Sequence, residues 1–364
     1  MKKIISIALA LLMVAVMLPV MAMADETLQS KIDAAPVGGT VKLDKEYTED
    51  IVINKELTID LNGNKLTNSA GDTITVNANG NLTITGNGTV DNVTHGRAAI
   101  FNNGTVTLNG GTYTRSAEVG TGKDPDSDNG NSWYTICNHG VMTVNAGATV
   151  KNKGTFSSVF ENGYYSYTEK SERVGHVEGT NNAAPKLTIN GGTFEGGKIT
   201  IKNDDGGILE INNGTFTNAW NRVVYNVNVA TINGGSFSCP ATNEIAVDSD
   251  KFNDTVNKGV MTITGGTFDG KVTKSNGTVT VSGGTFKKGV DESYIVDGKK
   301  LDANGNVVPE TITIIVPSEG GSTTTTPSTD NTKNPSTGAN DFVGVAAAMA
   351  VVSLLGAAAV IRKK

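Results

Sequence analysis

The chain has 364 residues, 44 of them glycine, and its 30 basic and 36 acidic residues give a net charge of −6. The terminal segments described below hold five of the basic residues and one of the acidic ones, which leaves 25 against 35 and a net charge of −10 for the region between them. This acidic balance, without a basic stripe, argues against nucleic acid as a partner and against electrostatic adhesion to anionic polymers.

Residues 1–24 have the three parts of a secretory signal peptide. Lys2 and Lys3 give a basic start, an apolar segment follows, and Ala22-Met23-Ala24 forms an A-x-A cleavage site. We expect the mature chain to begin near Asp25; the alternative is an uncleaved membrane anchor.

Residues 26–34 (ETLQSKIDA) place Leu28 and Ile32 one helical turn apart. This spacing predicts a short amphipathic helix. Because the open end of a stack of strands invites aggregation, we expect the helix to cover the first coil of the repeat that follows.

A short strand followed by a glycine turn recurs nine times along the chain. Alternation of apolar residues with Thr indicates the strand, and the glycine pair indicates the turn. The closest copies lie about 20 residues apart, and a unit of that size must stack on its neighbours to bury its apolar side. The copies are LTIDLNGN (57–64), LTITGNGTV (82–90), VTLNGGTY (106–113), MTVNAGATV (142–150), LTINGGTF (187–194), LEINNGTF (209–216), ATINGGSF (230–237), MTITGGTF (261–268) and VTVSGGTF (279–286).

A second phrase, an apolar residue followed two places later by Asn, lies midway between copies, as in Ile100-Phe101-Asn102 and Ile201-Lys202-Asn203. Each unit therefore holds three short strands, which suits either an antiparallel sandwich or a parallel β-helix. Stacked coils would place like residues on like, giving an asparagine ladder at the turns and an aromatic column. This favours the β-helix; the column comprises Tyr113, Phe156, Phe194, Phe216, Phe237, Phe268 and Phe286.

The repeated [LVM]T[IV]xGGTF unit, which covers most of 37–290, resembles the pectate-lyase-like β-helical surface proteins of Gram-positive gut bacteria. The expected fold is all-β: a single-stranded right-handed parallel β-helix of about nine to eleven short coils, spanning 25–308 with an N-terminal helical cap and a C-terminal hairpin. The resemblance implies no particular activity, because such folds include lyases, hydrolases and binding proteins.

The two cysteines, Cys137 and Cys239, fall three coils apart in this arrangement. At about 4.8 Å per coil they are separated by about 14 Å, whereas a disulfide requires roughly 7 Å or less between Cα atoms. We therefore expect two buried thiols rather than a disulfide.

Three segments interrupt the period. The first, 115–132, contains Asp124, Asp126 and Asp128 in the alternation of a calcium loop, although Pro125 intervenes and the glycine comes one place late. Calcium is thus the one candidate cofactor, and a solvated acidic loop is the alternative.

The second segment, 163–185, and the third, 249–259, each follow an apolar-x-Asn strand or its equivalent and should therefore leave the coil at one corner. Insertions on one side of a solenoid commonly form its binding surface. The candidate ligand-binding residues of the second segment are Tyr164, Tyr165, Tyr167 and His176, whose rings can stack on sugars or contact a protein. The alternative is that these tyrosines pin the insertion to the rod.

The sequence offers no catalytic residue that we assign. Glycoside hydrolysis needs two carboxyl groups about 5–9.5 Å apart. Asp204-Asp205 and Asp248-Asp250 follow strands two coils apart, but ordinary surface aspartates explain them as well. His95, His139 and His176 are scattered, without the spacing of a metal site.

Beyond the repeat, 294–308 predicts a hairpin around Ala303-Asn304-Gly305. Residues 309–338 then become rich in Ser, Thr, Pro and Gly, as in a flexible stalk that ends with a sorting signal. Residues 339–364 hold an apolar segment, 342–361, long enough to cross a bilayer, and a basic tail that favours the cytoplasmic side.

The sequence NPSTG before this segment resembles the LPxTG-type sorting signals of Gram-positive wall-anchored proteins. The resemblance implies that a sortase reads Asn334, Pro335, Thr337 and Gly338, cuts after Thr337 and joins it to peptidoglycan. Asn334 stands where leucine is commonest, which leaves the sortase class open. The alternative is a plain C-terminal membrane anchor.

These features predict a protein secreted and displayed on the cell wall, which contacts the membrane only through its C-terminal span before sorting. We expect an adhesin or a recognition scaffold for a glycan or a host surface protein. A displayed polysaccharide lyase or glycoside hydrolase is the first alternative, which two carboxylates and a basic residue converging in one groove would favour. A structural wall spacer is the second.

Overall fold

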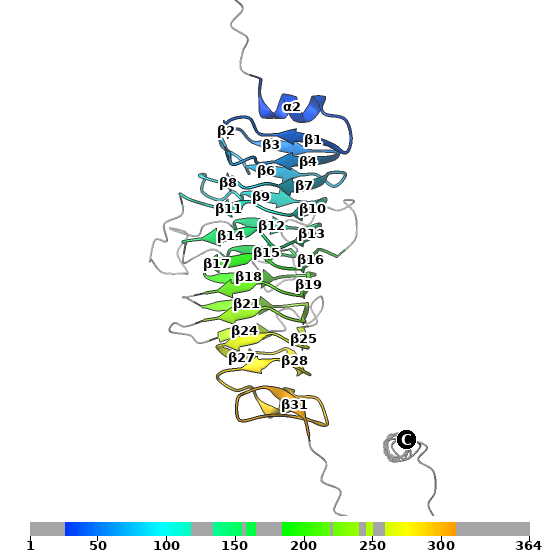
Figure 1. Ribbon diagram of the computed structural model, residues 1–364, viewed down its shortest axis with the longest axis vertical. Coiled ribbons are helices and arrows are strands. Elements are labelled where there is room, and N and C mark those ends of the chain that lie inside the picture. The colour runs from blue at the N-terminus through cyan, green and yellow to red at the C-terminus, as the bar shows by residue number, and fades with distance from the viewer. Residues whose placement is uncertain are drawn as a thin grey trace, which may run out of the picture. The chain divides into compact units, whose positions relative to one another are not determined.

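The computed structural model describes residues 26–117, 134–154, 158–164, 184–218, 221–239, 245–249 and 259–310, and the structural statements below refer to these residues. The chain separates into two compact units, Met1–Thr311 and Ile312–Lys364, and all described residues belong to the first. They form three parallel sheets of ten, ten and nine strands (Figure 1). Within each sheet, a strand pairs with the strand that comes three places later in the chain. The expected parallel β-helix is confirmed.

Sheet A collects the first strand of each coil, which is the repeated LTI-type strand. All of its neighbours are parallel and in register without a shift. Its strands are β1 (Gly39–Lys42), β4 (Glu56–Asp60), β7 (Asn81–Thr85), β10 (Thr105–Leu108), β13 (Val141–Val144), β16 (Lys186–Ile189), β19 (Ile208–Ile211), β22 (Val229–Ile232), β25 (Val260–Ile263) and β28 (Thr278–Val281). β1 is a tenth copy that the repeat pattern misses, because no glycine turn follows it.

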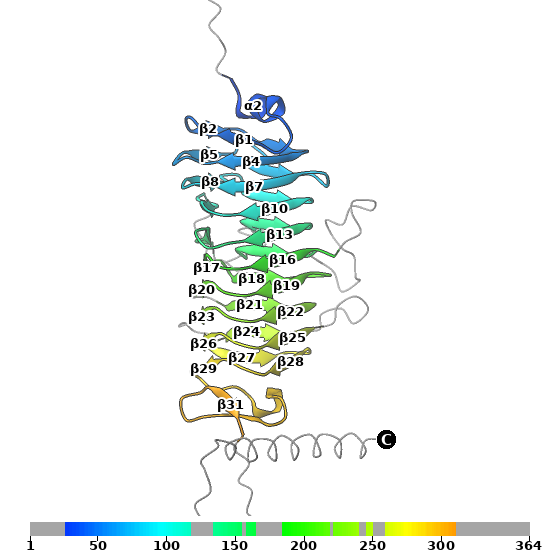
Figure 2. The ribbon, with the colours of Figure 1, turned by 45° about the vertical axis from the view of Figure 1, so that its right-hand side comes forward.

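Sheet B collects the second strand of each coil, directly after the glycine turn. Figure 2 shows sheets A and B as two adjacent columns of arrows. The strands of sheet B are β2 (Tyr47–Thr48), β5 (Lys65–Thr67), β8 (Thr89–Asp91), β11 (Thr112–Thr114), β14 (Thr149–Asn152), β17 (Thr193–Gly196), β20 (Thr215–Thr217), β23 (Ser236–Ser238), β26 (Thr267–Asp269) and β29 (Thr285–Phe286).

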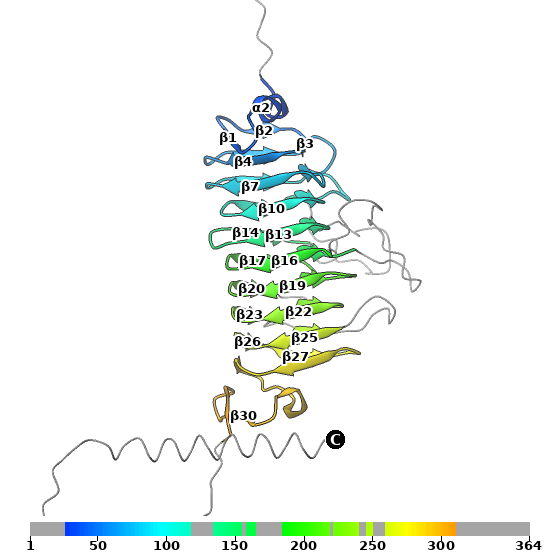
Figure 3. The same cartoon turned by 90° about the vertical axis from the view of Figure 1, so that its right-hand side faces the viewer.

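Sheet C collects the third strand, where the apolar-x-Asn phrases lie. Each coil thus crosses A, B and C in turn, and the coils are layered along the stack (Figure 3). The strands of sheet C are β3 (Ile51–Ile53), β6 (Ile74–Val76), β9 (Ile100–Asn102), β12 (Ile136–Asn138), β15 (Phe160–Asn162), β18 (Ile199–Asn203), β21 (Arg222–Asn226), β24 (Ile245–Ser249) and β27 (Lys271–Lys274).

The glycine pair allows the turns between sheets A and B to stack closely. A Cβ on Gly234 would lie 2.5 Å from the carbonyl oxygen of Asn212 in the preceding coil. Gly235 has φ of 103°, a conformation that other residues rarely adopt. The repeated Gly-Gly therefore follows from the close approach of consecutive backbones.

An aromatic column fills the core behind sheet B. Phe194, Phe216, Phe237, Phe268 and Phe286 stack in order, each ring centroid 4.8 Å from the next. The inclusion of Phe156 in this column was wrong: Val150 of β14 is in register between Tyr113 and Phe194. The aromatic position of each coil lies just after the turn that follows the LTI-type strand. In this coil that position is Val150, and the GTF at 154–156 comes later in the chain.

Asparagines form two ladders rather than one. The buried ladder joins Asn102, Asn138, Asn162, Asn203 and Asn226 at the ends of sheet C strands, through amide contacts of 2.7–2.8 Å. It confirms the expected ladder. The exposed ladder lies after the sheet A strands and comprises Asn109, Asn145, Asn190, Asn212 and Asn233.

Both ends of the stack are covered, as expected. Helix α2 (Leu28–Ala34) buries Leu28 and Ile32, and the side chain of Thr27 caps its first turn. At the other end, a 3-10 turn η1 (Glu292–Tyr294) leads into the antiparallel hairpin β30 (Lys299–Leu301) and β31 (Val307–Pro309). Val307 N–H donates to Gly284 O at 3.0 Å, which connects the hairpin to the last coil.

Cys137 and Cys239 are buried and carry thiols rather than a shared disulfide, as expected. None of the helices in the described part of the chain is long and apolar enough to cross a membrane. The apolar segment 342–361 and the signal-like residues 1–24 lie outside that part.

Candidate functional site

Connections that interrupt the period join the sheet C strands at both of their ends. Residues 118–133 lead into these strands from sheet B. Residues 165–183 and 250–258 lead from them to sheet A, so the second and third insertions leave at one corner, as expected. The outer face of sheet C is therefore the candidate site.

Tyr164 is the one candidate ligand-binding tyrosine that the structure describes. It is only 6% exposed, its N–H donates to Asp205 O at 2.8 Å, and its ring lies 5.2 Å from that of His139. Tyr164 thus holds the start of the insertion against the stack, which is the alternative considered above. The remaining candidates lie outside the described residues: Tyr165, Tyr167, His176, Asp124, Asp126, Asp128, Asn334, Pro335, Thr337 and Gly338.

The outward column of sheet C differs from that of sheet A. In sheet A, nine of the ten register-matched outward residues are threonine, and Glu210 is the exception. In sheet C no single residue type predominates along the column. It reads Val52, Thr75, Phe101, Cys137, Glu161, Lys202, Tyr225, Asp248 and Thr273.

Glu161, in the centre of β15, is the most unusual member of this column. It is fully buried, and in the described structure neither of its carboxylate oxygens accepts a hydrogen bond. Nε2 of His139, in the turn after β12, lies 3.5 Å from its Oε2. Burial raises the pKa of Glu161 to about 7; Asp204 adds to the shift, and His139 and Lys202 oppose it. Glu161 is thus an acid that changes charge near neutral pH.

Lys202 connects this buried acid to the surface. Its Nζ lies 2.5 Å from Oδ2 of Asp204, 3.5 Å from the hydroxyl of Tyr134 and 5.9 Å from the centre of that ring. Burial alone would lower the pKa of Lys202, yet Asp204, Tyr134 and Glu161 together raise it. The lysine side chain remains about 20% exposed, and Tyr134 is half-buried.

Together, Tyr134, His139, Glu161, Lys202 and Asp204 form what we call the Glu161 cluster. They come from three neighbouring coils, and Asp205 follows directly, paired through its backbone with Tyr164. The sequence indicated no role for Glu161, and His139 stood out only as one of three scattered histidines. The sequence signal that could have indicated this site is Glu161 itself, an acidic residue at the outward position of a strand that lies between two insertions.

A second charged group lies farther along the same face. Arg222 Nε is 2.9 Å from Oδ2 of Asp248, and its guanidinium lies 5.1 Å from the ring of half-buried Tyr225. Thr273 and Ser275 also donate to the Asp248 carboxylate. Strand register aligns Asp248 with Tyr225 of β21 and, through it, with Lys202 of β18. Asp248 is thus not the counterpart of Asp204; that position is Asp250, which lies outside the described residues.

Within the described ranges, no group of three or more His, Cys, Asp or Glu side chains could hold a metal ion. The calcium candidates are not among those residues, so calcium stays a prediction.

No protein family model matches this chain, and neither a curated protein nor a solved structure matches it.

Proposed function

We propose that this protein is a cell-wall-anchored surface protein whose β-helix recognises an extended ligand, a glycan or a host surface protein, on the outer face of sheet C. The observation that carries the proposal is the contrast between the two outward columns. A wall spacer would need only the uniform threonine surface of sheet A, whereas the sheet C column varies at nearly every coil between the two flanking sets of connections.

The chemistry of this face suits sugar rings and polar protein groups. Tyr134 and Tyr225 are half-buried aromatic rings, each next to a cation paired with a carboxylate. Such rings offer apolar contact area, and the paired charges supply donors and acceptors in fixed positions. Both tyrosines face the ligand in this proposal, while Tyr164 anchors the insertion.

Binding of purified residues 25–316 to mucins, plant polysaccharides and wall polymers tests this proposal. The described residues within that range form one capped unit. We expect saturable binding that Tyr225→Ala weakens about twofold to tenfold, since one aromatic contact contributes roughly 0.5–1.5 kcal/mol. The matched control is Thr188→Ala on the outer face of sheet A. Equal binding by both variants would show that the ligand lies elsewhere.

The proposed location rests on the two chain ends. Signal cleavage near Asp25 and sortase cleavage after Thr337 would leave the β-helix and stalk on peptidoglycan. Thr337→Ala should move the protein from the wall fraction to the membrane or medium, as measured by fractionation. Retention of this variant in the wall would contradict sortase anchoring.

A second candidate function is cleavage of a polysaccharide. It is favoured by the convergence of Glu161, Asp204, Lys202 and His139, because an acid that titrates near neutral pH can donate or accept a proton in catalysis. The same polymer panel, analysed for chain length after incubation, separates the two functions. A polymer recovered intact supports recognition. Shortening that is abolished by Glu161→Gln supports the enzyme.

A further inference from the structure

Among the described residues, the titratable groups around Glu161 come from the sheet C strands and the turns beside them. Cys137 of β12 and Lys202 of β18 are its register neighbours on either side. His139 follows β12 and Tyr134 precedes it, while Asp204 and Asp205 follow β18. In its neutral form Glu161 adds no charge to a site that already holds Lys202 and two aspartates.

Loss of the proton would place a further negative charge in this buried site. A buried carboxylate without hydrogen-bond donors is strongly disfavoured, so it must gain water or draw a cation toward itself. The nearest cation is Lys202, which already contacts Asp204 and Tyr134. The nearest imidazole is His139, whose ring contacts both Phe101 and Tyr164. Either response disturbs groups that position the ligand face.

We propose that Glu161 makes the ligand face of sheet C proton-sensitive: its neutral carboxyl keeps the cluster packed, and its ionisation loosens Lys202 and the anchorage of Tyr164. The inference rests on the proposed function for its effect on ligand binding, but the proton linkage itself does not. Binding is then tighter in mildly acidic than in mildly alkaline solution.

The sign of the effect on stability follows from the same equilibrium. The usual pKa of 4.5 rises to about 7 in the folded protein, so the folded state holds this proton more tightly than the unfolded state. The free energy of unfolding therefore falls as the pH rises from about 4.5 to about 7 and is level above that range.

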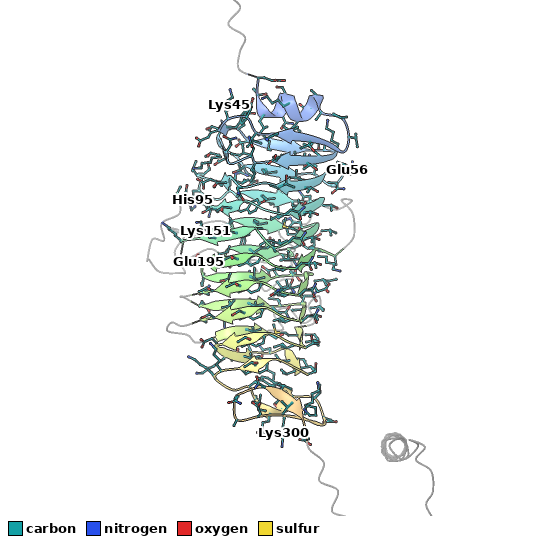
Figure 4. The ribbon with its side chains drawn as sticks, viewed as in Figure 1. Lys45, Glu56, His95, Lys151, Glu195 and Lys300 are labelled. Carbon is teal, nitrogen blue, oxygen red and sulfur yellow. The ribbon has the colours of Figure 1, made fainter. Side chains whose placement is uncertain are left out.

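The test compares wild type, Glu161→Gln and the matched control Glu195→Gln, which removes a carboxylate from an exposed position on β17 (Figure 4). Carboxyl NMR of the wild type should show Glu161 titrating near neutral pH, together with a change in the Tyr164 ring signals. Thermal unfolding from about pH 5 to about pH 8 should lose its Glu161-dependent slope in Glu161→Gln alone.

Titration of Glu161 in the range of a free glutamate would overturn the proposal. So would the same pH slope in wild type and Glu161→Gln. Binding to the polymer panel is measured at both ends of this pH range, where we expect several-fold weaker binding at alkaline pH in wild type and a smaller change in Glu161→Gln. If no polymer binds at any pH, the recognition function fails, while the NMR and unfolding data still decide the proton linkage.

Discussion

At the scale of single residues, the buried asparagine ladder shows how one side chain links three coils. Asn162 accepts a hydrogen bond from Asn138 and donates to Asn203 Oδ1 at 2.7 Å and to Ile208 O at 3.1 Å. These asparagines are buried, so the loss of one amide leaves several buried partners unpaired. The exposed ladder has the same spacing, but its partners can turn to solvent.

We expect Asn162→Ala to lower the free energy of unfolding by about 2–4 kcal/mol, because buried donors and acceptors lose their partners. The matched variant Asn190→Ala, in the exposed ladder, should cost less than about 1 kcal/mol. Chemical denaturation followed by circular dichroism measures both. Equal losses would mean that ladder geometry, rather than burial, decides the energy.

At the scale of elements, the phenylalanine column tests stacking between strands. Phe237 contacts a ring on each side, Phe216 and Phe268, whereas Phe286 contacts Phe268 alone within the column. We expect Phe237→Leu to be more destabilising than Phe286→Leu by about 0.5–1.5 kcal/mol, the contribution of one extra aromatic pair. Denaturation midpoints of the two variants decide this, and the opposite order would contradict it.

The N-terminal helix covers the first edge of the stack. Ile32→Asp should expose the end of the core beside β1 and cause association that increases with protein concentration. Ser30→Asp adds the same charge on the exposed side of α2 and should leave the association state of the wild type unchanged. Light scattering over a concentration series separates them. An Ile32→Asp variant that associates no more than the wild type would mean that the edge is protected without the helix.

At the scale of the whole β-helix, each coil contacts mainly its neighbours, so one coil should be removable. Deletion of 212–232 joins Ile211 to Asn233 and brings β25 next to β19 in the same register. We expect a folded, shorter and less stable protein, because one interface between coils is lost. Deletion of 212–222, about half a coil, puts the sheets out of phase and should prevent folding. Circular dichroism and size-exclusion chromatography compare the two.

Much of this architecture was predictable because each coil repeats the same local signals. The nine LTI-type strands, the cap residues Leu28 and Ile32, and the hairpin around Asn304 all occur where the pattern places them. Period-two alternation and Gly-Gly turns act within a few residues, so they can be read without long-range information. The misplaced Phe156 shows the limit, since the pattern GTF alone does not say which strand precedes it.

The sequence by itself determined the parallel β-helix and its covered ends, because the same short pattern recurs in every coil and like residues then stack on like. Only the tertiary structure decided the Glu161 cluster. His139, Glu161 and Lys202 are separated by connections of unequal length, so their spacing in the sequence does not indicate that they lie close together. Strand register in sheet C brings them onto consecutive coils. Register is set by pairing across the whole sheet, and this is why an apparently isolated histidine and an ordinary glutamate become neighbours in a buried site.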